Sequence, residues 1–429
     1  MLEKSSYSIS LGNTHQDGII SSTGMDRYNV KVSADTKLTS NWSSGFTANY
    51  ITTSIDKAVT SGNGLLRTVY AAPPSYDLAG IPSHVDGNPY TQNSFRGSFD
   101  NAYWAMENNK FTEDTNRFFG NVYTSYQTDF GTTNHKLNAK YMVGVDAYTT
   151  HYVDSYGYGS NTGGGRGQIE NYGWTNATYN SLLTINYDWH INEDWGLNAV
   201  VGNEIIQSNR KKYYEYGTNY NFPGWNHINN ATTQQTEEET WKNRTVGFFG
   251  NVSASYRNML YLTLTGRQDY VSNMPRKNRS FFYPSISAGF ILTELDALKN
   301  NVVNHAKLRV SYAEVGQAGD FLENYYSTPT YGGGFYMLTP IMYPMKGTTA
   351  YTPYYTIFDP KLKPQNTRSY EVGADVNFLD NLITFSYTYS RQNVKDQIFE
   401  VPLASSTGAS KLLTNGGKIH TNTHEFTLG

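Results

Sequence analysis

Apolar and polar residues alternate with a period of two over long stretches of this chain. In residues 260–265, for example, leucine alternates with tyrosine or threonine. Because successive side chains of a β-strand point to opposite faces, this pattern predicts strands with one apolar and one polar face. No charged residue falls on the apolar face of the six clearest segments, which lie at residues 30–35, 136–146, 183–189, 260–267, 307–312 and 371–378.

About fourteen strands are predicted in total. Many are longer than the roughly five or six residues typical of soluble sheets, and they approach the 9–11 residues that a tilted membrane strand needs. The predicted strands lie near residues 4–12, 27–38, 43–51, 117–129, 135–149, 179–191, 195–207, 243–256, 259–270, 282–292, 306–315, 367–378, 382–392 and 421–429.

The predicted connections alternate between short and long. Short turns are expected at residues 39–42, 130–134, 192–194, 257–258 and 379–381, with 293–305 as the longest of this set. Long connections are expected at residues 52–116, 150–178, 208–242, 316–366 and 393–420. Tight turns on one side and long loops on the other are typical of transmembrane β-barrels.

The composition excludes several other classes of protein. The 33 Lys and Arg against 36 Asp and Glu give a net charge of −3, which argues against a strongly basic nucleic-acid binder. The absence of cysteine excludes disulfide scaffolds and thiolate zinc sites. No apolar run approaches the roughly 20 residues of a transmembrane helix. We therefore predict an all-β protein, an antiparallel transmembrane β-barrel; a soluble β-sandwich is the alternative.

Aromatic residues beside the short turns are expected to form a girdle at one membrane interface, because aromatic side chains favour that boundary. Each of them has the parity of the apolar face of its strand. The predicted girdle residues are Trp42, Trp189, Trp195, Tyr256 and Phe378.

Several stretches resemble, in the same order, motifs of the SusC/RagA family of TonB-linked outer-membrane proteins. Residues 251–269 resemble a characteristic hairpin of that family, and residues 282–290 resemble its Phe-Pro-Ser-x-Ser-x-Gly-Trp strand. Residues 307–312 are similar to its Leu-Lys-Leu-Arg-x-Ser-Tyr-Gly strand, although Ala313 stands where glycine is usual. The remaining matches lie at residues 7–12, 17–20, 27–28, 359–364, 370–378 and 415–419.

The resemblance implies a barrel of about 22 strands with a plugged lumen. Residues 1–429 are then expected to form a single partial β-barrel domain, about 14 strands of those 22, without the N-terminal plug domain and the C-terminal closing strands. The implied function is TonB-dependent import of oligosaccharides, peptides or similar large nutrients across the outer membrane of a Gram-negative bacterium. The implied partners are outer-membrane lipid, a SusD-like surface lipoprotein and TonB, which would act through the plug region.

No catalytic, cofactor-binding or metal-binding residue is predicted. The nine histidines are scattered, and His424-Glu425 begins like a His-Glu-x-x-His motif but has Leu428 in place of the second histidine. The run Glu237-Glu238-Glu239 is interpreted as a solvated charge run in a loop.

The segment 325–358 combines many aromatic residues with glycine, threonine and proline, and aromatic faces with hydroxyls can contact sugars or a protein partner. The alternative is a loop cluster that packs only against itself. The residues predicted to contact substrate or partner are Tyr325, Tyr326, Tyr331, Phe335, Tyr336, Tyr343, Tyr354 and Tyr355.

Two further functions remain open at this point. One is a TonB-dependent receptor for siderophores or cobalamin, or a passive porin. The other is a secreted soluble β-sandwich that binds glycans or acts as an adhesin, which would be soluble without detergent.

Overall fold

The computed structural model describes residues 5–59, 65–162, 164–298, 300–321, 326–327, 330–332, 340–342, 346–348, 352–353 and 355–429. Long strands dominate these residues. No helix in this part of the chain is long and apolar enough to cross a membrane.

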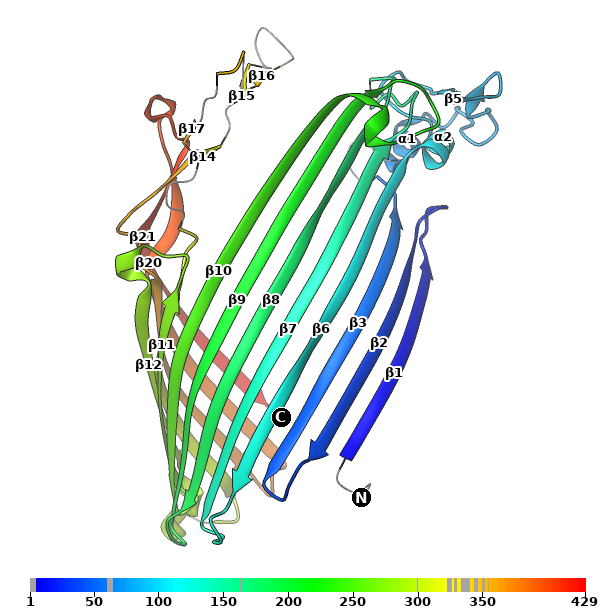
Figure 1. Cartoon of the computed structure of the whole chain (residues 1–429). Coiled ribbons are helices and arrows are strands. Elements are labelled where there is room, and N and C mark those ends of the chain that lie inside the picture. The colour runs from blue at the N-terminus through cyan, green and yellow to red at the C-terminus, as the bar shows by residue number, and fades with distance from the viewer. Residues whose placement is uncertain are drawn as a thin grey trace. The chain divides into compact units, whose positions relative to one another are not determined.

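The long strands form one sheet in which neighbours along the chain are neighbours in space (Figure 1). Among the described residues this sheet has 15 members, and the last of them, the short β18 (Thr356–Phe358), pairs in parallel with β21. The others are β1 (Ser5–Asp17), β2 (Gly24–Lys37), β3 (Trp42–Lys57), β6 (Lys110–Thr128), β7 (His135–Tyr156), β8 (Gln168–His190), β9 (Trp195–Tyr220), β10 (Ala231–Tyr256), β11 (Leu260–Val271), β12 (Ser280–Ile291), β13 (Val303–Gln317), β19 (Gln365–Phe378), β20 (Ile383–Pro402) and β21 (Lys411–Leu428).

The remaining elements are short. Two strand pairs lie between β13 and β19, and one pair with two helices lies between β3 and β6. These elements are α1 (Leu65–Ala71), β4 (His84–Val85), β5 (Asn88–Gln92), α2 (Ala102–Asn108), β14 (Tyr326–Ser327), β15 (Thr330–Gly332), β16 (Pro340–Met342) and β17 (Thr352–Pro353). Single 3₁₀ turns occur at Ile228–Asn230, Arg276–Asn278, Leu292–Glu294, Asp296–Leu298 and Ser405–Thr407.

The chain divides into two compact units. Unit 1 comprises Met1–Ser125, Tyr141–Ser181 and Ile206–Lys242. Unit 2 comprises Tyr126–Lys140, Leu182–Ile205 and Asn243–Gly429. Strands β6 to β10 contribute residues to both units.

The predicted number and order of long strands is confirmed, but several strands are longer than expected. Much of the predicted connections 150–178, 208–242 and 393–420 is strand, since β9 continues to Tyr220 and β10 already begins at Ala231. The predicted loop Glu237–Glu239 therefore lies within β10. The period-two signal is lost in these parts because polar residues occupy both faces, as in the run Thr-Thr-Gln-Gln-Thr at the start of β10.

In unit 1, apolar side chains of adjacent strands lie on one face of the sheet. Leu11 on β1 pairs with Val30 on β2, and Val30 pairs with Tyr50 on β3. Leu11 is 75% exposed and Tyr50 is 47% exposed. Burying apolar area is favourable by about 25 cal/mol per Å². A continuous row of exposed apolar side chains is therefore unfavourable in water and marks an interaction surface.

Unit 2 has the same arrangement. Leu264 on β11 pairs with Val252 on β10 and with Ile286 on β12. All three are exposed, although each has an apolar side chain. The predicted sorting of apolar residues onto one face of these strands is thus present in both units.

Buried apolar side chains are few in the described residues, and they lie in the connections or at the strand ends beside them. One such cluster, in unit 1, joins Ile169, Tyr220 and Ala231. Another, in unit 2, joins Val271, Met274 and Leu362. Within the part of the chain that the structure describes, the long strands enclose no comparable apolar core, which distinguishes them from the packed layers of a β-sandwich.

The connection between β3 and β6 is folded rather than an open loop. The indole of Trp104 on α2 is fully buried, and its Nε1 donates to the carbonyl oxygen of Pro89 at 2.8 Å. The carboxylate of Asp100 accepts hydrogen bonds from Ser160 Oγ at 2.6 Å and from the backbone N–H of Asn161 at 2.7 Å. Since these two donors belong to the β7–β8 connection, the two connections of unit 1 stabilise each other.

Candidate functional site

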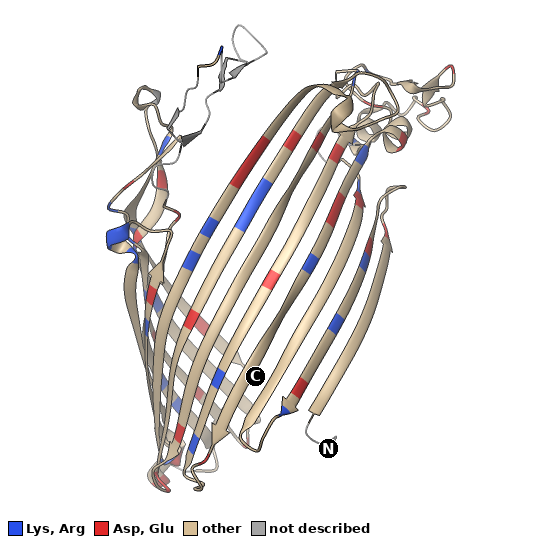
Figure 2. Ribbon diagram, in the orientation of Figure 1, with Lys and Arg blue, Asp and Glu red and all other residues tan. Residues whose placement is uncertain are grey.

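Charged residues lie along the lengths of the long strands and not only at their ends (Figure 2). In unit 1, Arg210 and Lys212 on β9 share one face with the ring of Trp174 on β8. On β7, Tyr141 and Val143 belong to the exposed apolar row, whereas Tyr152 has the opposite parity. On β8, the exposed Tyr179 is likewise opposite in parity to Tyr172. The face opposite the apolar row is therefore the candidate site.

The centre of this face is an arginine between two tryptophans. The guanidinium carbon of Arg210 on β9 is 3.5 Å from the ring centroid of Trp174 on β8 and 5.7 Å from that of Trp241 on β10. The two indole centroids are 6.1 Å apart. Cation–π contacts of this kind contribute roughly 0.5–1 kcal/mol at exposed sites. They fix the planar cation while Arg210 remains exposed.

Beside this group lies a ladder of ion pairs between β9 and β10. Lys212 Nζ is 3.1 Å from Glu239 Oε1 and 3.7 Å from Glu237 Oε1. Lys211 instead pairs with Glu238 at 2.9 Å. Adjacent residues of a strand face opposite ways, so the two sets of ion pairs lie on opposite faces of the sheet. The interpretation of the glutamate run as a loop was wrong, because it is paired strand.

Three tyrosines extend the same face toward β7. The rings of Tyr152 and Tyr172 stack with centroids 4.7 Å apart and planes 8° apart, and Tyr214 follows at 6.4 Å from Tyr172. The hydroxyl of Tyr172 donates to Asp154 Oδ2 at 3.0 Å. Lys57 Nζ lies 4.6 Å from the Tyr152 ring centroid. We call Tyr152, Tyr172, Trp174, Arg210, Tyr214 and Trp241 the aromatic wall.

The chemistry of the aromatic wall is that of a binding surface. Ring faces and charged donors can hold a polar ligand with apolar patches. Within the described ranges, no group of three or more His, Asp or Glu residues is arranged to hold a metal ion.

Unit 2 also has a polar face. Arg309 on β13 donates to Asp375 Oδ2 on β19 at 3.1 Å and to Thr388 Oγ1 on β20 at 2.8 Å. The neighbours Leu308 and Val310 point to the other face and are exposed. The side-chain network thus links three strands across the polar face of this unit.

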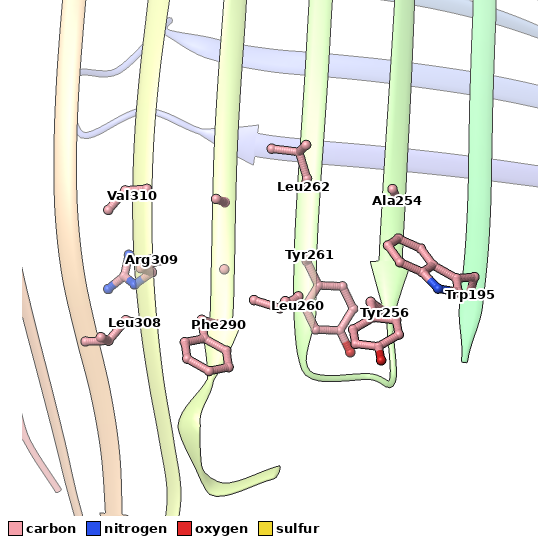
Figure 3. A pocket seen from close by; sticks show the side chains of 12 residues that line it. Trp195, Ala254, Tyr256, Leu260, Tyr261, Leu262, Phe290, Leu308, Arg309 and Val310 are labelled. Atoms are coloured by element: carbon pink, nitrogen blue, oxygen red, sulfur yellow. The ribbon is translucent and has the colours of Figure 1, made fainter. Parts of the chain in front are cut away.

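On its apolar face, unit 2 has a shallow hollow of about 370 Å³ (Figure 3). Its wall includes Trp195 and Tyr256, whose ring centroids are 4.6 Å apart. The small side chains of Ala254 and Ala288, on either side of Leu262, leave the space open. Two rings at the edge of an apolar surface match the chemistry of a membrane interface.

The five predicted girdle residues lie at or near the turn-proximal ends of their strands. Trp42 and Trp195 are the first residues of β3 and β9, and Tyr256 and Phe378 are the last residues of β10 and β19. Trp189, one residue before the end of β8, stacks on His135 with centroids 5.7 Å apart. Their role as an interfacial girdle stays a prediction.

Most of the predicted aromatic contact loop lies outside the described residues. This holds for Tyr325, Phe335, Tyr336, Tyr343 and Tyr354. The backbones of two others belong to short strands, Tyr326 to β14 and Tyr331 to β15. Tyr355 is 53% exposed. The proposed role of this set stays a prediction.

The aromatic wall was missed by the sequence interpretation. Its residues on β8, β9 and β10 fall within 150–178 and 208–242, which were expected to be loops. A usable signal was present, since Lys211-Lys212 and Glu237–Glu239 are complementary charge runs on consecutive strands. Opposite charges facing each other across a strand pair are stabilising.

A family model described as "TonB dependent receptor-like, beta-barrel" matches residues 68–428. The chain belongs to this family. The predicted all-β barrel fold is thereby confirmed, and the exposed apolar rows of both units are those expected of a barrel wall.

The relatives of this TonB-dependent receptor-like chain include proteins of the family that the motifs resembled. It is 25% identical to "TonB-dependent receptor SusC" of Bacteroides thetaiotaomicron over 98% of this chain and 43% of that protein. It is 24% identical to "TonB-dependent receptor P26" of Formosa agariphila over 99% of this chain and 42% of that protein. The SusC/RagA resemblance is confirmed, and the chain spans less than half the length of these relatives.

Solved structures share the fold. "Structure of the RagAB peptide transporter" superposes with a TM-score of 0.79 at 15% identity, over 99% of this chain and 46% of that one. The siderophore receptor PiuA of Acinetobacter baumannii gives a TM-score of 0.55 at 11% identity, over 99% of this chain and 57% of that one. The strand arrangement is therefore more similar to RagAB than to this siderophore receptor.

Proposed function

We propose that this chain forms part of the barrel wall of a TonB-dependent importer of SusC/RagA type in the outer membrane of a Gram-negative bacterium. The observation that carries the proposal is the two-faced strand, with exposed apolar rows on one face and the aromatic wall on the other. Lipid would cover the first face, and a hydrated route would run along the second.

The proposed substrates are oligosaccharides, peptides or similar nutrients that are too large for passive pores. Stacked tyrosines and the Arg210 group supply ring faces, hydroxyls and a fixed cation, which suit such polar polymers. A SusD-like lipoprotein would act at the long connections, and TonB would act through a plug region. The proposed role is binding and passage, without a catalytic step.

Replacement of Arg210 tests the proposal at the aromatic wall. Arg210→Ala and Trp174→Ala remove the cation and the ring that holds it, so uptake of a radiolabelled substrate oligosaccharide or peptide should fall at least fivefold. Lys211→Ala is the matched control, because it removes a neighbouring cation of β9 that points to the other face. Uptake is measured in cells with equal amounts of the full-length protein in the outer membrane.

Three results would contradict the proposal. One is equal uptake in the Arg210 and Lys211 variants. The second is substrate uptake that persists unchanged in a strain without TonB. The third is recovery of the full-length protein in the soluble fraction without detergent.

A further inference from the structure

The β9–β10 connection, residues 221–230, carries an exposed aromatic group that lies apart from the aromatic wall. Its sequence is Phe222-Pro223-Gly224-Trp225. Proline at the second and glycine at the third position are typical of a type II turn, in which the third residue needs a positive φ. Gly224 has φ 84°. Such a turn brings its first and fourth residues, Phe222 and Trp225, close together.

The rings of this turn are nearly parallel. The centroids of Phe222 and Trp225 are 5.8 Å apart with planes 15° apart, and those of Trp225 and His227 are 4.8 Å apart with planes 7° apart. Phe222 is 51% exposed and Trp225 is 43% exposed. We call Phe222, Trp225 and His227 the loop platform.

The backbone that carries the loop platform is fixed by one buried amide. Asn230 is 1% exposed, and its Nδ2 donates to the carbonyl oxygens of both Phe222 and Trp225 at 2.8 Å. Asn226 Nδ2 donates to the carbonyl oxygen of Asn108, at the end of α2, at 2.9 Å. The backbone that carries the rings is therefore held in place before any ligand arrives, which reduces the entropy lost on binding.

The polar groups around the rings add hydrogen-bonding capacity. His227 Nδ1 accepts the backbone N–H of Asn229 at 3.2 Å. In the neutral imidazole this places the ring proton on Nε2, where it can be donated to a ligand hydroxyl. The amide side chain of Asn229 lies in the same ten-residue connection, whereas those of Asn221 and Asn226 donate to backbone carbonyls of the protein. Flat apolar faces bordered by such groups match a sugar ring, which has apolar faces and a rim of hydroxyls.

The size of the loop platform argues against a protein partner as its occupant. A stable protein interface buries roughly 800 Å² on each side and involves about 20–30 residues. Three rings on one short connection supply only a small part of that area. One or two sugar rings, by contrast, can be held by two or three aromatic faces.

We propose that the loop platform is a saccharide-binding site that captures an oligosaccharide on the outside of the protein, before the aromatic wall is reached. This inference deepens the proposed function and rests on it, because it assigns saccharides as the substrate class. Trp225 supplies the main stacking face, on the side that His227 does not cover, Phe222 adds a second ring, and His227 donates through Nε2.

The test measures binding separately from uptake. Full-length protein in detergent is titrated with maltohexaose, cellohexaose, xylohexaose, hexagalacturonate and a hydrophilic hexapeptide, and heats of binding are recorded. At least one hexasaccharide should bind, and Trp225→Ala should weaken that binding at least tenfold. Trp225→Phe, which keeps an aromatic face, should recover a large part of it.

Tyr70→Ala is the matched control, since Tyr70 on α1 is an 84% exposed aromatic residue of the same unit. It should change saccharide binding less than twofold. The inference is overturned if no hexasaccharide binds, if only the hexapeptide binds, or if Trp225→Ala binds as the wild type does. Persistent uptake in a strain without TonB would contradict the proposed function alone, because the titration involves no transport.

Discussion

Asp359 fixes the chain before β19 through both of its carboxylate oxygens. Oδ1 accepts the backbone N–H of Lys361 at 2.8 Å, and Oδ2 accepts the hydroxyl of Thr414 on β21 at 2.7 Å. These donors stabilise the ionised form, and the N–H of Lys361 is the larger cause, so the pKa of Asp359 lies below its ordinary value. The side chain thus connects a long connection to the end of a strand within unit 2.

A lowered pKa makes this contact sensitive to acid. The stabilisation is fully present above the unfolded pKa of about 3.9, and it is lost as the pH falls through the lower folded pKa. Hydrogen exchange at the Lys361 amide, corrected for the intrinsic rate, should therefore accelerate on acidification in the wild type. Asp359→Asn should weaken protection at neutral pH by about 1 kcal/mol and abolish the pH dependence. An identical pH profile in both proteins would contradict the assignment.

At the scale of elements, α2 shows how a long connection keeps its structure. Trp104 is fully buried there, whereas the adjacent Tyr103 is 44% exposed. Trp104→Ala should destabilise the connection between β3 and β6 by about 3–5 kcal/mol, because it leaves a cavity and an unpaired carbonyl at Pro89. Limited proteolysis of the full-length protein should then cut within residues 65–109. Tyr103→Ala should leave the cleavage pattern unchanged, and equal cleavage of both variants would argue against this account.

The same elements show what sequence alone could predict. β11 was predicted almost to its ends, because its leucines alternate strictly with polar residues and tyrosine, so that the leucines share one exposed face. The first half of β10 was not predicted as strand, because threonine, glutamine and glutamate occupy both of its faces and leave no period-two signal. The burial of Trp104 depends on partners from other parts of the chain, which no local pattern reveals. The aromatic wall was missed for the first of these reasons, since its rings lie in parts of the strands that lack a period-two signal.

At the scale of the whole molecule, the family assignment and the separation of apolar and polar residues onto opposite faces of the strands together predict which face tolerates a charge. Leu264 lies on the exposed apolar face near the middle of a membrane-length strand, whereas its neighbour Thr265 accepts a hydrogen bond from Asn251 Nδ2 at 2.8 Å on the polar face. An arginine near the midplane of the lipid face costs about 2–4 kcal/mol. Leu264→Arg should therefore reduce stability in lipid vesicles by this amount, and Thr265→Arg should reduce it much less, because water can solvate the charge there.

Urea titration of the heat-modifiable, folded species on a gel measures both variants of the full-length protein. The comparison is matched for depth, because the two residues are adjacent on β11, and it changes only the face that receives the charge. Comparable losses would mean that the apolar row does not contact hydrocarbon. Soluble, fully folded Leu264→Arg protein without detergent would favour the sandwich alternative, since lipid would then have no part in covering the exposed leucines. We expect a large difference in stability between the two variants. In a barrel wall, adjacent residues of one strand face lipid on one side and water on the other, so the two arginines would enter different solvents.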